Sequence, residues 1–158
     1  MNSTHPDFAG VHIGALSDAE ALKVLNANTT EPVKILNGEV LELDSKRGFC
    51  RFRFEIVPAF CHSQGRICQG GFLTGMVDTA MANAAIAKGK LAVAVPTLEL
   101  KISFFEPMGP GIVFAEGRVM RWGGSVGFLD GDIKDDKGRV VVHATSTIKI
   151  VRPRPQSS

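Results

Sequence analysis

The longest apolar stretch of the chain covers residues 72–87, and it constrains the fold more than any other feature. It is shorter than the roughly 20 residues that a membrane-spanning helix needs, and Asp78 and Asn83 lie near its middle. A helix that is apolar nearly all round must be covered on most of its sides. Small residues such as Gly75 and Ala80 allow close approach of the covering backbone. The stretch therefore predicts a buried central helix.

On both sides of this helix, apolar and polar residues alternate with the period of two that is typical of β-strands. Turn residues, such as those at 44–48 and 135–138, separate the alternating runs. Ser17 and Glu20 form a capping box that predicts a short helix over about residues 19–26. Residues 57–69 have no clear period and are expected to form a loop. The predicted strands cover residues 41–43, 50–56, 98–104, 112–121, 126–133 and 140–151.

The order of these elements predicts a single α+β domain over residues 1–158, with its core at about residues 33–151. A curled antiparallel sheet of about six strands is expected to wrap the long central helix, and the short helix precedes it. Residues 1–16 and 152–158 are expected to be mobile tails, because they lie outside the periodic segments. The prolines within residues 152–158 also prevent the last strand from continuing.

Composition argues against several classes of protein. The net charge is +2 and the charges are interleaved, so nothing indicates binding to nucleic acid or to a membrane. Cys50, Cys61 and Cys68 are an odd number without Cys-x-x-Cys spacing, which argues against disulfides and against a zinc site. Free thiols and the lack of a secretory signal predict a cytoplasmic location. Neither a metal nor a separate cofactor is expected.

The residues with the clearest chemical meaning lie at the start of the central helix. Gly70 and Gly71 are expected to leave its first backbone N–H groups unobstructed, at the positive end of the helix dipole, where an oxyanion can bind. Asp78 places a carboxylate within the apolar helix, and burying it unpaired costs on the order of several kcal/mol. It therefore needs an ion-pair partner or a chemical role. Oxyanion donors and a carboxylate together suit hydrolysis of an activated carbonyl compound.

This segment resembles the signature of the PaaI-type acyl-CoA thioesterases, whose hotdog fold wraps a sheet around one long helix. The signature is His-Gly-Gly, four variable residues, an apolar residue, one further residue and then Asp or Glu. This chain has Gln69, Gly70, Gly71, Met76 and Asp78 at those positions. A homo-oligomer is expected: a homodimer with shared active sites, either alone or as a dimer of dimers. The resemblance implies hydrolysis of a small or medium acyl-CoA, aromatic groups included, to free acid and CoA, with CoA present only as part of the substrate.

The resemblance also implies roles for individual residues. Asp78 is expected to attack the thioester carbonyl or to activate a water that does so, while the N–H of Gly70 holds the carbonyl oxygen. Thr97, by its distance from Pro107, matches a residue that places the water or the carboxylate. Gln69 stands where the family has histidine, and its amide can donate a hydrogen bond but cannot titrate.

A second departure from the family concerns the loop before the helix, where the family has Asn or Gln. Aligning the loop on Gly65 puts His62 at that position, ungapped alignment puts Ser63 there, and Gln64 is a third alternative. The expected catalytic residues are thus Asp78, Gly70, Gln69, Gly71, His62 and Thr97. The expected substrate-binding residues, which follow the CoA channel of the family, are Ser63, Gln64, Phe104, Phe105, Arg121, Gly123, Gly124 and Ser125, with Arg121 as the phosphate contact.

Helix geometry requires two chains for one site. Gly70 and Asp78 are eight residues apart, which is about 12 Å along a helix, whereas a reacting carbon must lie about 3 Å from both groups. Two antiparallel helices related by a two-fold axis meet this demand, because each N-terminus faces the middle of the other. Two alternative functions remain open: a hotdog protein that binds CoA or acyl chains without hydrolysis, and a hotdog dehydratase or hydratase. Gln69 favours the first, and the missing histidine disfavours the second.

Overall fold

A computed structural model describes residues 16–91 and 93–152. The predicted mobile tails, 1–16 and 152–158, lie outside the described residues except for positions 16 and 152. None of the described helices is long and apolar enough to cross a membrane. The helices are α1 (Asp18–Ala27), α2 (Glu31–Ile35), the 3-10 helix η2 (Pro58–Phe60) and α3 (Gly70–Lys88). The strands are β1 (Gly38–Asp44), β2 (Phe49–Ile56), β3 (Cys61–His62), β4 (Ile67–Cys68), β5 (Thr97–Phe104), β6 (Gly111–Trp122), β7 (Val126–Lys134) and β8 (Val140–Lys149).

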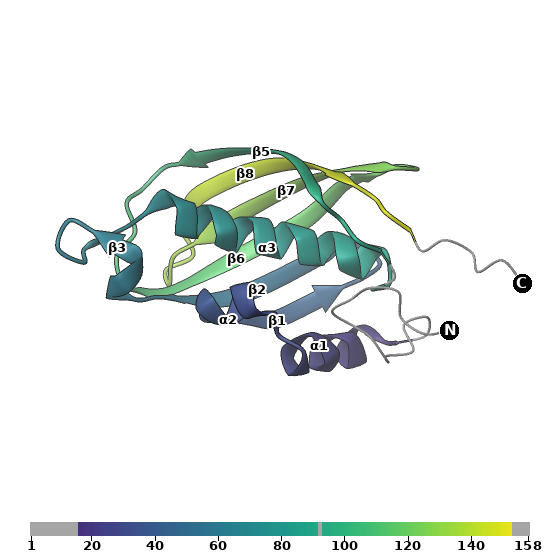
Figure 1. The fold of residues 1–158 in the computed structure, drawn as a ribbon, viewed down its shortest axis with the longest axis horizontal. Helices are drawn as coiled ribbons and strands as arrows, with labels where there is room; N and C mark the ends of the chain where they lie inside the picture. Colours follow the sequence, from purple (N-terminus) through teal and green to yellow (C-terminus); the bar gives the residue numbers. More distant parts are fainter. Residues whose placement is uncertain (1–15, 92, 153–158) are drawn as a thin grey trace, which may run out of the picture.

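Six antiparallel strands form one sheet that curls around α3 (Figure 1). Their order is β1-β2-β6-β7-β8-β5, so β1 and β5 are the two edge strands. The helices α1 and α2 lie beside β1 (Figure 1). This arrangement confirms the predicted hotdog architecture: one α+β domain with a long central helix, a six-stranded wrapping sheet and a short N-terminal helix.

The central helix touches the sheet at two glycines. A Cβ added at Gly117 of β6 would overlap the backbone of Ala80 and Met81, and one added at Gly131 of β7 would lie 2.7 Å from the Cγ of Met81. Ala80, Met81 and Ala84 of α3 are fully buried. Because a side chain at either glycine would hold the helix away from the strands, the missing Cβ atoms set the distance between the two layers.

The helix α1 begins with the predicted capping box and ends in a bond to the sheet. The Ser17 Oγ accepts a hydrogen bond from the Glu20 N–H, and the Ser17 N–H donates to the Glu20 carboxylate at 2.8 Å. The Asn26 side chain donates to the carbonyl of Val40 at 2.9 Å and accepts from its N–H at 3.0 Å. This amide therefore pairs with the edge strand β1 much as a further strand would.

Two features near the N-terminus differ from the sequence-based expectation. Leu25 of α1 is buried in the main core, so the core extends beyond the predicted range of residues 33–151, because one face of α1 packs on β1. The helix α2 was not predicted. Pro32 lies in its first turn, where the missing N–H costs nothing because that donor has no partner within the helix.

The segment of residues 57–69, predicted to be a loop, contains η2 and a hairpin of β3 and β4 that forms a separate two-stranded sheet. The hairpin turn places Ser63, Gln64 and Gly65 at positive φ (53°, 61° and 77°). Phe60 stacks on Phe72, with ring centroids 4.4 Å apart, and this contact fixes the hairpin against the start of α3. Periodicity could not predict strands of two residues, because they contain no repeat.

Replacement of Gly117 tests the contact between helix and sheet. Gly117→Ala should lower the free energy of unfolding by about 1–3 kcal/mol, since the added methyl group must push α3 away from β6. Gly124→Ala is the matched control, because nothing lies within 4 Å of a Cβ added there, and its effect should stay within about 0.5 kcal/mol. Urea unfolding followed by circular dichroism measures both values. Equal effects of the two substitutions would contradict the close contact.

Candidate active site

Asp78 lies half-buried on α3, and Thr97 of β5 is its hydrogen-bond partner. The Thr97 hydroxyl donates to Asp78 Oδ1 at 3.1 Å. The β5–β8 pairing shifts by one residue between Thr97 and Glu99. Such an insertion re-aims the neighbouring side chains, and here Thr97 reaches α3 from the edge of the sheet. The structure therefore brings together the predicted carboxylate and the predicted hydroxyl residue.

The electrostatic environment of Asp78 disfavours its charged form. Burial raises the pKa of Asp78 above its ordinary value, and the Thr97 hydrogen bond only partly opposes this effect, because it stabilises the carboxylate. Among the described residues no cation contributes to the pKa of Asp78. A structural ion pair therefore does not explain this carboxylate, and a raised pKa on an isolated group is typical of functional sites.

The start of α3 is only partly as expected. The Gln69 side chain accepts a hydrogen bond from the Gly71 N–H at 2.7 Å, as an N-cap residue does. The expectation that both glycine N–H groups are open is therefore wrong for Gly71. Within the described part of the chain, the Gly70 N–H donates to no acceptor. One oxyanion donor remains, and the Gln69 side chain lies next to it.

Phe104 places the end of β5 against the start of α3. A Cβ added at Gly70 would lie 3.0 Å from the Phe104 ring, so the ring packs directly on this glycine. Thr97, at the other end of β5, touches Asp78. Gly70 and Asp78 are about 12 Å apart along α3. One chain thus carries two separate half-sites. Asp78 with Thr97 forms one, and Gly70 with Phe104 forms the other, at opposite ends of β5.

The three alternatives for the family's Asn position lie in the β3–β4 hairpin. His62, Ser63 and Gln64 are exposed, and the His62 Nδ1 lies 2.8 Å from the Ser63 Oγ. No described hydrogen bond joins any of them to Asp78 or to Gly70 within one chain. The structure therefore leaves all three at the surface, on the side of the molecule where α3 begins.

The remaining predicted substrate-binding residues separate into two groups. Phe105 is exposed beside Phe104, close to the start of α3. Arg121 and residues 123–125 lie in and after the end of β6, near the opposite end of α3, where Gly48 lies between Val119 and the last helical residue. The ends of α3 are roughly 27 Å apart. In one chain, this second group does not meet Gly70.

The two buried thiols, those of Cys50 and Cys68, offer no alternative nucleophile. Burial raises the pKa of the Cys68 thiol to about 11, and it raises that of Cys50 further. Thiolates are the reactive form of cysteine, so these two remain in their unreactive form at neutral pH. Within residues 16–152, Ala92 excepted, no three His, Cys, Asp or Glu side chains are placed to hold a metal ion.

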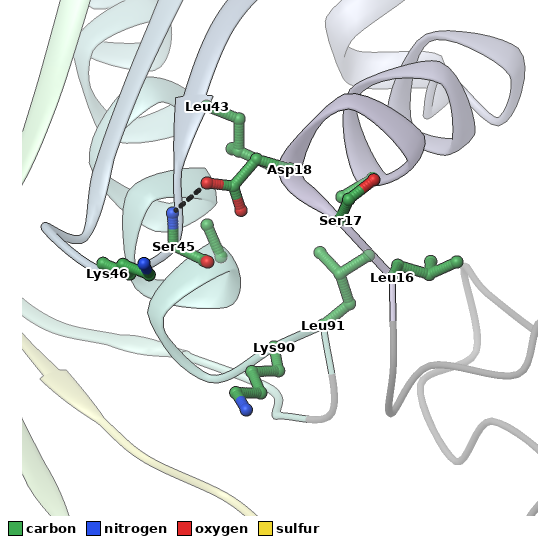
Figure 2. A pocket seen from close by; sticks show the side chains of 10 residues that line it. Leu16, Ser17, Asp18, Leu43, Ser45, Lys46, Lys90 and Leu91 are labelled. Atoms are coloured by element: carbon green, nitrogen blue, oxygen red, sulfur yellow. Dashed lines mark hydrogen bonds between the residues drawn. The ribbon is translucent and has the colours of Figure 1, made fainter.

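Two cavities flank α3. The larger, of about 380 Å³, lies at its C-terminal end between the start of α1 and the β1–β2 turn (Figure 2). There Asp18 accepts a hydrogen bond from the Ser45 N–H at 3.2 Å. None of the predicted site residues lines this cavity. The smaller, of about 210 Å³, is lined in part by Asp78, Ala82 and Ile86.

The sequence analysis missed the lining of the smaller cavity. Ala82 and Ile86 follow Asp78 by four and eight residues, so helical spacing places all three on one face of α3. That spacing was a usable signal within the sequence. The opposite wall comes from α1, α2 and β1, and it depends on α2, which the sequence analysis did not predict.

Two sequence comparisons with known proteins indicate the same kind of protein. A sequence model described as the thioesterase superfamily matches residues 66–142. A protein of Saccharolobus solfataricus named "putative esterase" is 30% identical over 129 residues, which cover 79% of this chain and 83% of that protein.

Solved structures are similar over most of the chain. A Ralstonia eutropha protein described as a "putative thioesterase, phenylacetic acid degradation-related protein" has 26% identity and a TM-score of 0.73, covering 83% of this chain and 97% of its own. The E. coli PaaI protein from the phenylacetic acid degradation operon has 21% identity and a TM-score of 0.72, covering 85% and 91%. A Haemophilus influenzae thioesterase has 12% identity and a TM-score of 0.76, covering 92% and 98%. The last two identities support the fold alone.

The raised pKa of Asp78 makes a prediction about stability. An aspartate whose folded-state pKa is raised binds its proton more tightly in the folded state, so stability falls as pH rises from about 3.9 through the folded-state pKa. Asp78→Asn removes this ionisation and should raise Tm at pH 8 but not at about pH 3.

Thermal unfolding of the wild type and the variant at both pH values measures this difference. Asp136→Asn, in the exposed β7–β8 turn, is the control and should show no such change between the two pH values. An equal Tm difference at both pH values for Asp78→Asn would contradict the unfavourable burial of the carboxylate.

Proposed function

This chain belongs to the thioesterase superfamily and is a thioester hydrolase, and we propose that it hydrolyses acyl-CoA to free acid and CoA with Asp78 as its catalytic carboxylate. The observation that carries the proposal is the environment of Asp78. Its carboxylate is half-buried, has a raised pKa, has no cationic partner among the described residues and receives a hydrogen bond from Thr97. The acyl group that we propose is small or medium, aromatic groups included. The free thiols fit a reducing compartment such as the cytoplasm.

Two reaction routes use the same carboxylate. As a nucleophile, Asp78 attacks the thioester carbonyl carbon, the C–S bond breaks, CoA leaves as a thiolate that takes up a proton, and water hydrolyses the resulting anhydride. As a general base, Asp78 takes a proton from water, the hydroxide attacks the same carbon, and the proton passes to the departing sulfur. Thr97 holds one carboxylate oxygen in both routes, which leaves the other free to react.

The negative charge that develops on the carbonyl oxygen needs donors at a second place. The Gly70 N–H supplies one, with the positive end of the α3 dipole behind it. Gln69 stays neutral at every working pH and presents its amide N–H₂ group beside Gly70 while its oxygen caps Gly71. His62, Ser63 and Gln64, at the hairpin tip, are the candidates for a further polar contact to the substrate.

The edge strand β5 supports a site shared between two chains. Its apolar side chains are exposed in the single chain: Leu98 by 59% and Phe104 by 48%, with Phe105 just beyond it by 58%. A long, exposed, apolar edge strand is a template for pairing with another chain. Antiparallel pairing of β5 with β5 of a second copy would bury these side chains and continue the sheet.

Such pairing also joins the two half-sites. Thr97 and Phe104 are the ends of β5, so a two-fold axis through its centre places Thr97 opposite Phe104 of the partner subunit. Asp78 touches Thr97, and Gly70 touches Phe104. Asp78 of one subunit therefore comes to the Gly70 of the other, which is the arrangement that one reacting carbonyl needs. Two such dimers would form the proposed dimer of dimers, and Arg121 remains our candidate for a CoA phosphate contact.

Loss of the carboxylate tests the catalytic proposal. Asp78→Asn and Asp78→Ala should each lower kcat for release of CoA by at least about a hundred-fold, the usual contribution of a positioned acid or base. The acid limb of kcat/KM should lie above the ordinary aspartate pKa, because burial raises the pKa of Asp78. This limb should be retained in His62→Gln. A limb that disappears in that variant would assign the titration to histidine, and retention of a tenth of the activity without Asp78 would refute its role.

Mixing two inactive variants tests the shared site. Asp78→Ala removes the carboxylate, and Gly70→Pro removes the donor N–H. A mixed dimer has one site with both defects and one with neither, so random re-pairing should restore about a quarter of wild-type activity. Each variant alone is the control for residual activity, and size-exclusion chromatography and circular dichroism check assembly and fold. Subunit exchange without any recovery of activity would show that the site does not span two chains.

A further inference from the structure

The smaller cavity beside α3 begins at the proposed catalytic carboxylate. Its volume is about 210 Å³, and Asp78, Thr79, Ala82, Asn83 and Ile86 of α3 form one of its walls. Asp78 and Ile86 are eight residues apart, so the cavity extends for about 12 Å along the helix towards its C-terminus. A substrate carbonyl held at Asp78 would thus have a partly open groove directly beside it. The facing wall comes from Leu25, Asn26, Asn28, Thr29, Thr30, Pro32, Val33, Val40 and Phe52.

We propose that this cavity is the acyl-binding pocket, sized for a single aromatic ring with a short spacer or for a straight chain of about eight carbons. The proposal rests on the proposed function, since it assigns a place to the acyl group of that substrate. It also assigns specificity to Ala82 and Ile86 of α3 and to the wall formed by α1 and α2.

The size of the cavity sets the upper limit. An apolar cavity of about 150 Å³ accepts benzene, and a water-sized group occupies about 30 Å³. The volume of about 210 Å³ therefore holds a six-carbon ring and roughly two further carbon atoms. Longer chains would have to displace Phe52 or the α1–α2 connection.

The chemistry of the lining favours an acyl group over the CoA end of the substrate. The apolar surface comes from residues such as Leu25, Val40 and Phe52, which are buried, and from Ile86. Asp78 is the one charged side chain among the lining residues, which all belong to the described part of the chain. The phosphates of CoA need Lys or Arg contacts, and this cavity offers none. Neutral polar side chains line the rest of the cavity: Thr79 and Asn83 of α3, and Asn26, Asn28, Thr29 and Thr30 of the facing wall.

The far wall is held in place without a ligand. Asn26 bonds both backbone groups of Val40, and the Thr29 hydroxyl donates to the Asn26 carbonyl at 2.8 Å. Leu36, just after α2, is buried and lies close to Gly75 of α3. These contacts hold α1 and α2 in place as the wall that faces α3. The length of the cavity is therefore set by the folded protein and does not depend on a flexible loop.

The test changes the space within the cavity by substitutions in its α3 wall. Ala82→Leu adds about three carbons within the cavity, and Ile86→Ala removes about three. The measured quantity is kcat/KM for a straight-chain series from butanoyl-CoA to dodecanoyl-CoA, together with one arylacetyl-CoA. Ala27→Leu is the matched control, because it makes the same change on the exposed end of α1, outside the cavity lining.

In the wild type, kcat/KM should rise to about eight carbons and then fall. Each methylene that no longer fits costs about fourfold in kcat/KM, from about 0.8 kcal/mol per CH₂. Ala82→Leu should thus lower kcat/KM for octanoyl-CoA by roughly 60-fold while changing butanoyl-CoA by less than about threefold. Ile86→Ala should move the optimum about three carbons longer, and Ala27→Leu should leave the profile unchanged. An equal loss at all chain lengths in Ala82→Leu would overturn the proposal.

Non-hydrolysable S-alkyl-CoA thioethers separate this proposal from the proposed function. Their affinities, measured by calorimetry, should show the same shift with chain length in Ala82→Leu. If the thioethers show the shift but no acyl-CoA is hydrolysed, the pocket stands and the enzymatic proposal fails. If acyl-CoAs are hydrolysed and both profiles match those of the wild type, the acyl group binds elsewhere and the pocket proposal fails.

Discussion

The contact of α3 with the glycines of the sheet is the constraint on which the remaining structure depends. Gly117 lets the helix backbone lie directly on β6, and Gly131 leaves room on β7 for the side chains of Val77 and Met81. At that depth the sheet can curl far enough for its edge strand β5 to reach the exposed side of the helix. The hydrogen bond between Thr97 and Asp78 exists only because the edge of the sheet comes this close. The absence of side chains at these two glycines thus permits a polar contact on the opposite side of α3.

The same constraint explains why the carboxylate is unfavourable for the fold. A helix pressed into a curled sheet has one open face, and that face carries Asp78 with a cavity beside it. Burial raises the pKa of Asp78, and one hydroxyl offsets only part of this effect. A residue that destabilises the folded state when it ionises, and whose burial is only partly compensated, is expected where its chemistry is required.

Periodicity and turn residues predicted the long helix, the six strands and the capping box, because each extends over several residues of regular pattern. The same approach could not find α2, whose five residues begin with a proline-containing turn, or the two-residue strands β3 and β4. Asp78, Gly70 and Thr97 could be selected from a local motif. The bond from Gln69 to Gly71 could not, because it depends on side-chain direction, and neither could the cavity wall that faces α3, because it comes from segments distant in sequence.

The bond between Asn26 and Val40 has a consequence for assembly that goes beyond the pocket wall. A sheet with two open edges can add copies without end and form a fibre. In this chain an amide side chain occupies both backbone groups of Val40 on the outer side of β1, while β5 remains open. The edge at β1 is therefore interrupted at Val40, whereas β5 has no such side-chain bond to its outer backbone groups among the described residues. If two copies pair through β5 as we propose, Val40 of each is already occupied, which disfavours further growth of the sheet beyond the pair.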